Sequence, residues 1–172
     1  MFFVITGGGK GKTTSALGQG VRSCGSGKRV LMIQFIKGPW KSGEDNPRVW
    51  PPGFELRKRG LGFVGQTSDK IPRQKHIAAA QKALDEAFQE IDSGQWNMII
   101  LDEINVALDL GLIKLDQALK CVGAAENKKI DLIFTGRVAP KEIIEKADVV
   151  SEIRDIKHVF QKGIKARKGF DY

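Results

Sequence analysis

A glycine-rich loop directly after an apolar run is the feature that most constrains the fold of this chain. Residues 2–5 read F-F-V-I, and residues 6–14 read T-G-G-G-K-G-K-T-T. Glycine lets the backbone bend through positive φ and bring its N–H groups against an anion, and a helix beginning at Lys12 adds its positive dipole end. The order predicted is therefore a strand, a phosphate-binding loop and a helix. The predicted phosphate-binding residues are Gly7, Gly8, Gly9, Lys10, Gly11, Lys12, Thr13 and Thr14.

The loop departs at one position from the strict phosphate-loop pattern, which has glycine where this chain has Thr6. The neighbouring glycines compensate for that difference. In the pattern, Lys12 reaches the outer phosphates of a nucleotide and the Thr13 hydroxyl holds Mg²⁺. The alternative is a glycine-rich turn without a ligand, and Gly-Lys-Thr-Thr after a strand argues against it.

The chain has 172 residues and a formal net charge of +8. That length suits one domain over residues 1–172, with a core large enough to need no disulfide or metal clip. Cys24 and Cys121 are far apart and belong to no C-x-x-C pair, so the sequence indicates neither a disulfide framework nor a zinc site. Without a signal-peptide pattern or an apolar run of membrane-spanning length, we expect a soluble, cytoplasmic protein.

Apolar runs alternate with helical patterns, which predicts a doubly wound, mostly parallel α/β sheet. The predicted strands are Phe2–Thr6, Arg29–Phe35, Phe54–Arg57, Asn97–Asp102, Ile130–Thr135 and Val149–Ile153. The predicted helices are Lys12–Cys24, Pro72–Asp92, Leu115–Ala125 and Pro140–Lys146. With the phosphate loop, this order is typical of the P-loop NTPase (RecA-like) fold.

A second motif, which is acidic, lies at the end of the predicted strand at residues 97–102. An apolar run that ends in Asp102 and Glu103 places these carboxylates at the carboxyl edge of the sheet, where open α/β folds bind ligands. If the strand continued through both residues, they would point to opposite faces, and one would address Mg²⁺ while the other met a structural partner. Two surface acids that cap the next helix are the alternative.

No residue stands out as a general base. Arg137 follows a predicted strand at the same edge, and His158 lies near the carboxyl end. His76 falls on a different helix face from the apolar stripe that contains Ile77, so we expect a surface histidine. Composition and spacing alone therefore predict an α/β domain that binds a magnesium nucleotide.

Several longer segments resemble the P-loop ATP:corrinoid adenosyltransferases over essentially the whole chain. They are the phosphate loop, Q-F-I-K-G-P-W-K-S-G-E at 34–44, G-F at 62–63, L-D-E at 101–103, T-G-R at 135–137, A-D at 147–148, S-E at 151–152, and the ending K-H-V-F-Q-K-G-I-K-A-R-K-G-F-D-Y. The 34–44 block and the ending are the most specific to that family.

The resemblance implies transfer of the 5′-deoxyadenosyl group of ATP to the Co(I) centre of a reduced corrinoid, with release of triphosphate. Co(I) is itself a strong nucleophile, so the reaction needs no general base. The resemblance also implies a nucleotide that lies reversed along the loop, with Arg137 at the ATP site and Glu103 rather than Asp102 in the magnesium shell. The acceptor is cobalamin or a precursor such as cobinamide.

The family also displaces the lower ligand of cobalt with an aromatic wall. Phe63 matches one position of its G-F-T-W-E-T motif, but Gly65 stands where that motif has tryptophan. Trp40 lies in another matching segment and is our second candidate for a corrinoid contact. The chain also begins without the amino-terminal extension of the longer members, from which we expect a more open corrinoid pocket.

The resemblance further implies a homodimer, and the basic ending suggests an acidic, flavodoxin-like electron donor that docks on Lys165, Arg167 and Lys168. We expect no nucleic-acid partner, because few aromatic residues accompany the basic charge. Two alternatives stay open at this point. A nucleoside kinase of the thymidine kinase type would need zinc cysteines that this chain lacks, and a nucleic-acid-stimulated ATPase would need neither the tail nor the tryptophan segment.

Overall fold

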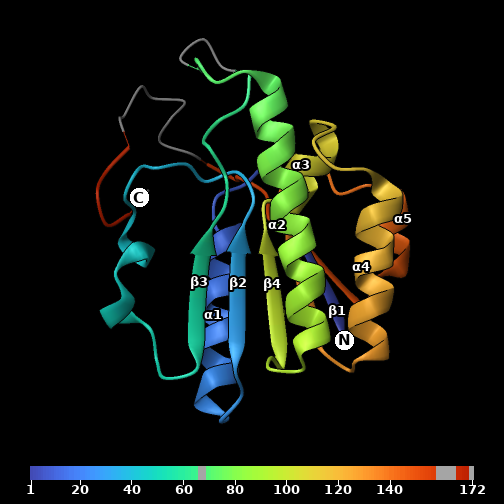
Figure 1. Ribbon diagram of the computed structural model, residues 1–172. Helices are drawn as coiled ribbons and strands as arrows, with labels where there is room; N and C mark the ends of the chain where they lie inside the picture. Colours follow the sequence, from blue (N-terminus) through green and yellow to red (C-terminus); the bar gives the residue numbers. More distant parts are fainter. Residues whose placement is uncertain (66–68, 158–165, 171–172) are drawn as a thin grey trace.

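The structure is a computed structural model that describes residues 1–65, 69–157 and 166–170. Its described residues form one parallel sheet of six strands in the order β3-β2-β4-β5-β1-β6 (Figure 1). The strands are β1 (Phe2–Thr6), β2 (Val30–Gln34), β3 (Phe54–Lys58), β4 (Met98–Asp102), β5 (Asp131–Thr135) and β6 (Val149–Glu152). Each lies within one residue of its predicted bounds, and the predicted α/β fold class is confirmed.

The helices α1 (Lys12–Gly25), α2 (Arg73–Ser93), α4 (Leu115–Asn127) and α5 (Lys141–Lys146) occur where the sequence predicts them. Three short elements were not predicted: the helix α3 (Ile104–Asp109) and two single turns of 3-10 helix, η1 (Gly43–Asp45) and η2 (Pro47–Val49). Among the described residues, no helix is both long and apolar enough to cross a membrane. Cys24 and Cys121 are buried free thiols.

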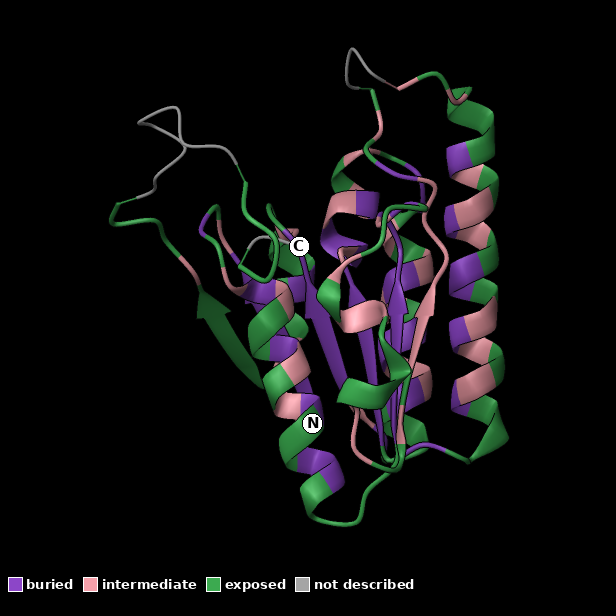
Figure 2. Ribbon diagram, turned by 90° about the vertical axis from the view of Figure 1, so that its left-hand side faces the viewer, coloured by how far each residue is buried: buried purple, intermediate pink, exposed green. Residues whose placement is uncertain are grey.

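Helices cover both faces of the sheet, so the central strands are buried on both sides (Figure 2). On β2, Val30 and Met32 face the side covered by α1, whereas Leu31 and Ile33 face the side covered by α2 to α5. This alternation explains why β2 and β4 read as unbroken apolar runs in the sequence. Because all strands are parallel, their carboxyl ends and the loops that follow them share one edge of the sheet.

The expectation that His76 lies on the surface is wrong, because this residue lies on the inner face of α2. His76 is 3% exposed, not a surface histidine. It lies in line with Ala80, Ala83 and Ala87, which are buried at helical spacing against the sheet. Small alanines at these positions let the helix approach the strands closely, and this approach buries His76 as well.

Two glycines on α1 test how tightly this helix packs. A Cβ at Gly20 would lie 2.4 Å from Cε2 of Phe54, whereas a Cβ at Gly18 would meet nothing within 4 Å. We expect Gly20→Ala to lower the free energy of unfolding by about 1–3 kcal/mol through overpacking. Gly18→Ala, its control on the same helix, should raise it by about 0.5–1 kcal/mol, because alanine favours the helix. Urea unfolding of both variants measures the difference, and equal effects would contradict the packing at Gly20.

Candidate functional site

The phosphate loop runs from the carboxyl end of β1 to the first turn of α1, as predicted. Gly7 and Gly11 have φ of 99° and 125°, a region that favours glycine, and Gly11 is the N-cap of α1. No acidic residue occupies the first turn of α1, so the positive end of the helix dipole is not offset within that turn. The amino end of α1 is therefore suited to hold an anion.

The segment after β6 packs directly against this loop. A Cβ at Gly7 would lie 2.3 Å from the carbonyl oxygen of Ile153, and a Cβ at Gly9 would lie 2.7 Å from the carbonyl carbon of Arg154. The Gly9 N–H donates to the carbonyl of Ile153 at 2.8 Å, and the Lys10 N–H donates to Oδ1 of Asp155 at 3.1 Å. In this conformation, the N–H groups of Gly9 and Lys10 are already bonded. The backbone N–H groups that can contact a phosphate are therefore those of the other loop residues and of the first turn of α1.

Lys12 lies inside the loop and is 7% exposed. Its Nζ donates to the carbonyl of Gly9 at 2.8 Å, which holds the ammonium at the centre of the loop. Burial lowers the pKa of Lys12, and the nearby negative charge of Glu103 opposes that shift. A buried cation in this position is suited to neutralise the charge of a polyphosphate.

Asp102, at the end of β4, is fully buried and accepts three side-chain hydrogen bonds. Its Oδ1 accepts from the hydroxyls of Thr13 at 3.0 Å and Thr135 at 2.6 Å, and its Oδ2 accepts from Nε2 of Gln34 at 3.0 Å. Burial raises the pKa of Asp102, and the bonds from these three side chains oppose that shift. Asp102 thus joins the ends of β2, β4 and β5 to the first turn of α1.

Glu103 does not continue the strand, because β4 ends at Asp102. Its φ of 63° is left-handed, and its N–H donates to the hydroxyl of Thr135 at 2.9 Å. Burial and the neighbouring Asp102 raise the pKa of Glu103, while Lys12 and Arg137 oppose the shift. The turn directs this carboxylate into the pocket described next, away from the bonded Asp102.

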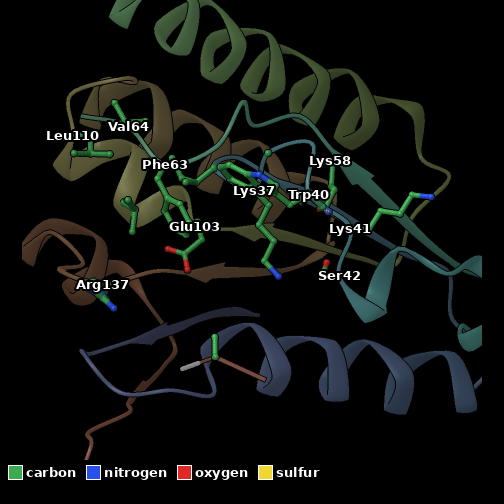
Figure 3. Close-up of a pocket in the computed structure, with 14 residues that line it drawn as sticks. Lys37, Trp40, Lys41, Ser42, Lys58, Phe63, Val64, Glu103, Leu110 and Arg137 are labelled. Carbon is green, nitrogen blue, oxygen red and sulfur yellow. Dashed lines mark hydrogen bonds between the residues drawn. The ribbon is translucent and has the colours of Figure 1, made fainter. Parts of the chain in front are cut away.

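A pocket of about 840 Å³ opens beside the phosphate loop (Figure 3). That volume lies within the usual range for small-molecule sites. One wall is apolar and contains Ile36, Trp40, Phe63, Val64, Val106 and Leu110. Glu103 and Lys37 extend from this side toward the blue ribbon of α1, and Arg137 lies on the loop after β5. The pocket therefore combines an apolar wall with a charged floor next to the nucleotide loop.

Trp40 and Phe63 stack on each other in the apolar wall. Their ring centroids are 5.7 Å apart and the rings lie at 30°, yet the residues are 61% and 57% exposed. Two aromatic rings paired with each other but open to the pocket offer a surface for a flat apolar ligand.

Close backbone contacts between two loops bring these rings together. The Gly62 N–H donates to the carbonyl of Ile36 at 2.9 Å, and a Cβ at Gly38 would lie 2.7 Å from Cα of Gly62. Nζ of Lys58 donates to the carbonyl of Trp40 at 2.7 Å and pairs with Asp45 at 2.6 Å. The pairing of β2 with β3 thus sets the position of the wall.

Several residues that organise this site were not predicted from the sequence. Gln34 and Thr135, which donate to Asp102, end β2 and β5 at the same edge of the sheet. Thr135 also ends a predicted strand and Gln34 is the last but one residue of another, and that position was the available signal. Lys37 and Lys58 also line the pocket, and Lys37 pairs with Glu44. The lining residues not predicted are Ile36, Lys37, Gly38, Lys41, Ser42, Lys58, Val64, Val106, Leu110 and Ala166.

The predicted residues fall into three groups. Thr13, Asp102, Glu103, Arg137, Trp40 and Phe63 gather around the pocket and the adjoining loop. Gly65 lies beside Val64 of the wall, and its φ of 72° disfavours a side chain such as the tryptophan of the family motif. His158 and Lys165 lie outside the described residues, as does most of the basic ending.

Comparisons with known proteins agree with the resemblance. The family model described as "ATP:corrinoid adenosyltransferase BtuR/CobO/CobP" matches residues 1–172. The chain is 36% identical to a corrinoid adenosyltransferase of Escherichia coli (strain K12), over all of this chain and 85% of that protein. It is 35% identical to the corrinoid adenosyltransferase CobA of Salmonella typhimurium (strain LT2), with the same coverage. It is 38% identical to a corrinoid adenosyltransferase of Pseudomonas aeruginosa (strain PAO1), over all of this chain and 83% of that protein.

Proposed function

This chain belongs to the ATP:corrinoid adenosyltransferase family, and we propose how its residues divide the work of that reaction. The enzyme transfers the 5′-deoxyadenosyl group of ATP to the cobalt of a reduced corrinoid. In the proposal, the phosphate loop and Lys12 hold the triphosphate, and the pocket walled by Trp40 and Phe63 receives the corrinoid. The observation that supports it best is the stacked, exposed aromatic pair in a pocket that adjoins the phosphate loop.

The reaction needs positioning and charge stabilisation more than proton transfer. The cobalt supplies an electron pair to C5′, the C5′–O bond breaks, and its electrons leave with the triphosphate. Lys12 and the amino end of α1 are suited to stabilise the charge that grows on this leaving group. This division agrees with the lack of an evident general base among the pocket-lining residues that the structure describes. It leaves the nucleoside kinase and the nucleic-acid-stimulated ATPase unfavoured.

The site also fits Mg²⁺, which prefers oxygen ligands and keeps several waters in its shell. Asp102 already accepts three side-chain hydrogen bonds, so Glu103 is the better candidate for the metal shell. Thr13 directs its hydroxyl proton to Asp102, which leaves its oxygen lone pairs for a cation. When bound, Mg²⁺ would neutralise charge on the triphosphate, while Asp102 orients Thr13.

The aromatic wall is proposed to exclude the lower ligand of cobalt, which makes Co(II) easier to reduce. With glycine at position 65, Trp40 supplies the second ring beside Phe63. The ring of Trp40 also limits residue 62 to glycine, because a Cβ there would lie 2.8 Å from Cη2 of Trp40. The acceptor is proposed to be cobalamin or a precursor such as cobinamide.

The proposal also includes the oligomeric state, the location and an electron-donor partner of the enzyme. A homodimer follows from the family resemblance, and a cytoplasmic location from the composition. Lys157, Arg167 and Lys168 are exposed near the carboxyl end, which suits an acidic, flavodoxin-like electron donor. Charge reversal at Arg167 and Lys168 should slow turnover with a protein reductant and spare turnover with a chemical reductant, because only the former needs docking. Equal loss in both assays would instead place this segment at the ATP or corrinoid site.

Lys12→Ala should lower kcat by about 100- to 1,000-fold at saturating ATP, because the lost ammonium stabilises the leaving group in the transition state. Lys120→Ala is the control, since Lys120 is exposed on α4 and pairs with Asp116 one turn away on the same helix. Adenosylated corrinoid formed from chemically reduced cobalamin is the readout. Near-normal kcat in Lys12→Ala would contradict the role of Lys12.

Glu103→Gln should raise the Mg²⁺ concentration needed for half-maximal activity, because the metal has few protein ligands and each matters to its octahedral shell. Magnesium titrations at fixed ATP compare this variant with Asp102→Asn, which alters the organisation of Thr13. A raised Mg²⁺ requirement in Asp102→Asn but not in Glu103→Gln would mean that Asp102, and not Glu103, belongs to the metal shell.

Trp40→Ala should raise the KM for cobalamin about tenfold and lower the four-coordinate Co(II) fraction, because the ring contributes both contact area and stacking. The KM for ATP should not change. Trp40→Phe keeps a ring at this position, so its KM for cobalamin and its four-coordinate Co(II) fraction should stay close to the wild-type values. A normal four-coordinate fraction in Trp40→Ala would place the second ring elsewhere.

A further inference from the structure

Asp69 closes the loop that carries Phe63 by accepting two backbone hydrogen bonds. Its Oδ2 accepts from the Gly65 N–H at 2.9 Å, and its Oδ1 accepts from the Ile71 N–H at 2.9 Å. The Asp69 side chain is only 8% exposed. These bonds hold the pKa of the Asp69 carboxyl below its usual range, so it remains an anion that accepts charge-assisted bonds.

His76 holds Asp69 from the other side. Its Nε2 lies 3.3 Å from Oδ1 and 3.2 Å from Oδ2 of that carboxylate, and His76 is itself 3% exposed. The histidine stands one turn inside α2, whose next buried residues, Ala80 and Ala83, pack in the core. Asp69 therefore connects the segment that carries Phe63 to a helix whose inner face is buried in the core.

The loop needs such an anchor because of its composition. Gly60, Gly62 and Gly65 surround Phe63, and glycine leaves the backbone more freedom than any other residue. At one end the loop is held by the hydrogen bond from Gly62 to Ile36. At the other end, the Gly65 N–H donates to Oδ2 of Asp69.

The same helix end also holds another part of the wall. Nη2 of Arg73, in the first turn of α2, donates to the carbonyl of Leu110 just after α3. Leu110 lines the pocket together with Phe63 and Val64. The amino end of α2 is thus linked to two of the three segments that contribute the apolar wall, to Leu110 through Arg73 and to the 63–65 segment through His76 and Asp69.

We propose that Asp69 and His76 are positioning residues for adenosyl transfer, which hold the 63–65 segment so that Phe63 stands against Trp40 in the corrinoid pocket. The inference rests on the proposed function of that pocket. Neither residue lines the pocket, so their effect on the reaction passes through the position of Phe63. Loss of the anchor therefore weakens use of the corrinoid and leaves use of ATP unchanged.

Asp69→Ala tests the anchor. It should raise the KM for cobalamin about tenfold and lower the four-coordinate Co(II) fraction, with an unchanged KM for ATP, because two backbone groups lose their acceptor. Asp92→Ala is the matched control, since Asp92 lies near the other end of α2 and its exposed carboxylate pairs with Lys128 at 3.5 Å. A merely structural role would lower the yield of folded protein but leave the KM and the spectrum of that protein normal.

His76 variants separate bonding from packing. His76→Leu fills the space without a donor and should reproduce the corrinoid defect, whereas His76→Gln retains a donor and should restore most of the wild-type KM. In the double variant Asp69→Ala/His76→Leu, the defect should not exceed that of Asp69→Ala alone, because both residues act through one contact. Fully additive defects would overturn the proposed chain of contacts.

Amide exchange of the free protein, measured by NMR, tests the contact independently of activity. Asp69→Ala should speed exchange at Gly65 and Ile71 about tenfold, and Asp92→Ala should not. Unchanged exchange in Asp69→Ala would overturn the anchor. Faster exchange with a normal KM for cobalamin would overturn the positioning role while leaving the proposed function intact. A wild-type protein that neither binds nor adenosylates cobalamin would overturn the proposed function, and the positioning role with it.

Discussion

The buried carboxylate of Asp102 holds the candidate site together. It accepts hydrogen bonds from the ends of β2 and β5 and from the first turn of α1. An unpaired carboxylate in this position would be costly, because burial removes its hydration. The three donors offset that cost, and they fix the phosphate-loop helix against the carboxyl edge of the sheet. The first turn of α1 and the carboxyl ends of β2 and β5 are therefore positioned relative to this group.

Two surfaces with different chemistry meet beside Asp102. On one side, the amino end of α1 and Lys12 form a cationic loop that is suited to phosphates. On the other side, Trp40 and Phe63 form an apolar wall that the pairing of β2 with β3 positions. Glu103 lies between them because the chain turns through a left-handed conformation after β4. A reaction between a polyphosphate ester and a large, flat acceptor suits such a junction.

The sequence predicts the sheet well, because parallel strands buried on both faces read as unbroken apolar runs. It does not predict α3, which is short and begins after a left-handed Glu103 without a side-chain cap. The burial of His76 was missed because the stripe that continues it consists of alanines, which give a weak apolar signal. Trp40 and Phe63 were both candidates, but their contact depends on the adjacency of β2 and β3, and hydrophobic periodicity does not give strand order. The Asp69–His76 contact was missed for a similar reason, since it joins a loop to a helix by side-chain geometry alone.

Phosphorus NMR of the reaction products tests the central claim most directly. The protein is incubated with magnesium, ATP and chemically reduced cobalamin, and parallel mixtures replace cobalamin with thymidine or with DNA. Attack at C5′ predicts intact triphosphate in amounts equal to the adenosylated corrinoid, and neither parallel mixture should yield it. Orthophosphate with ADP, or thymidine monophosphate with ADP, in place of triphosphate would contradict the account.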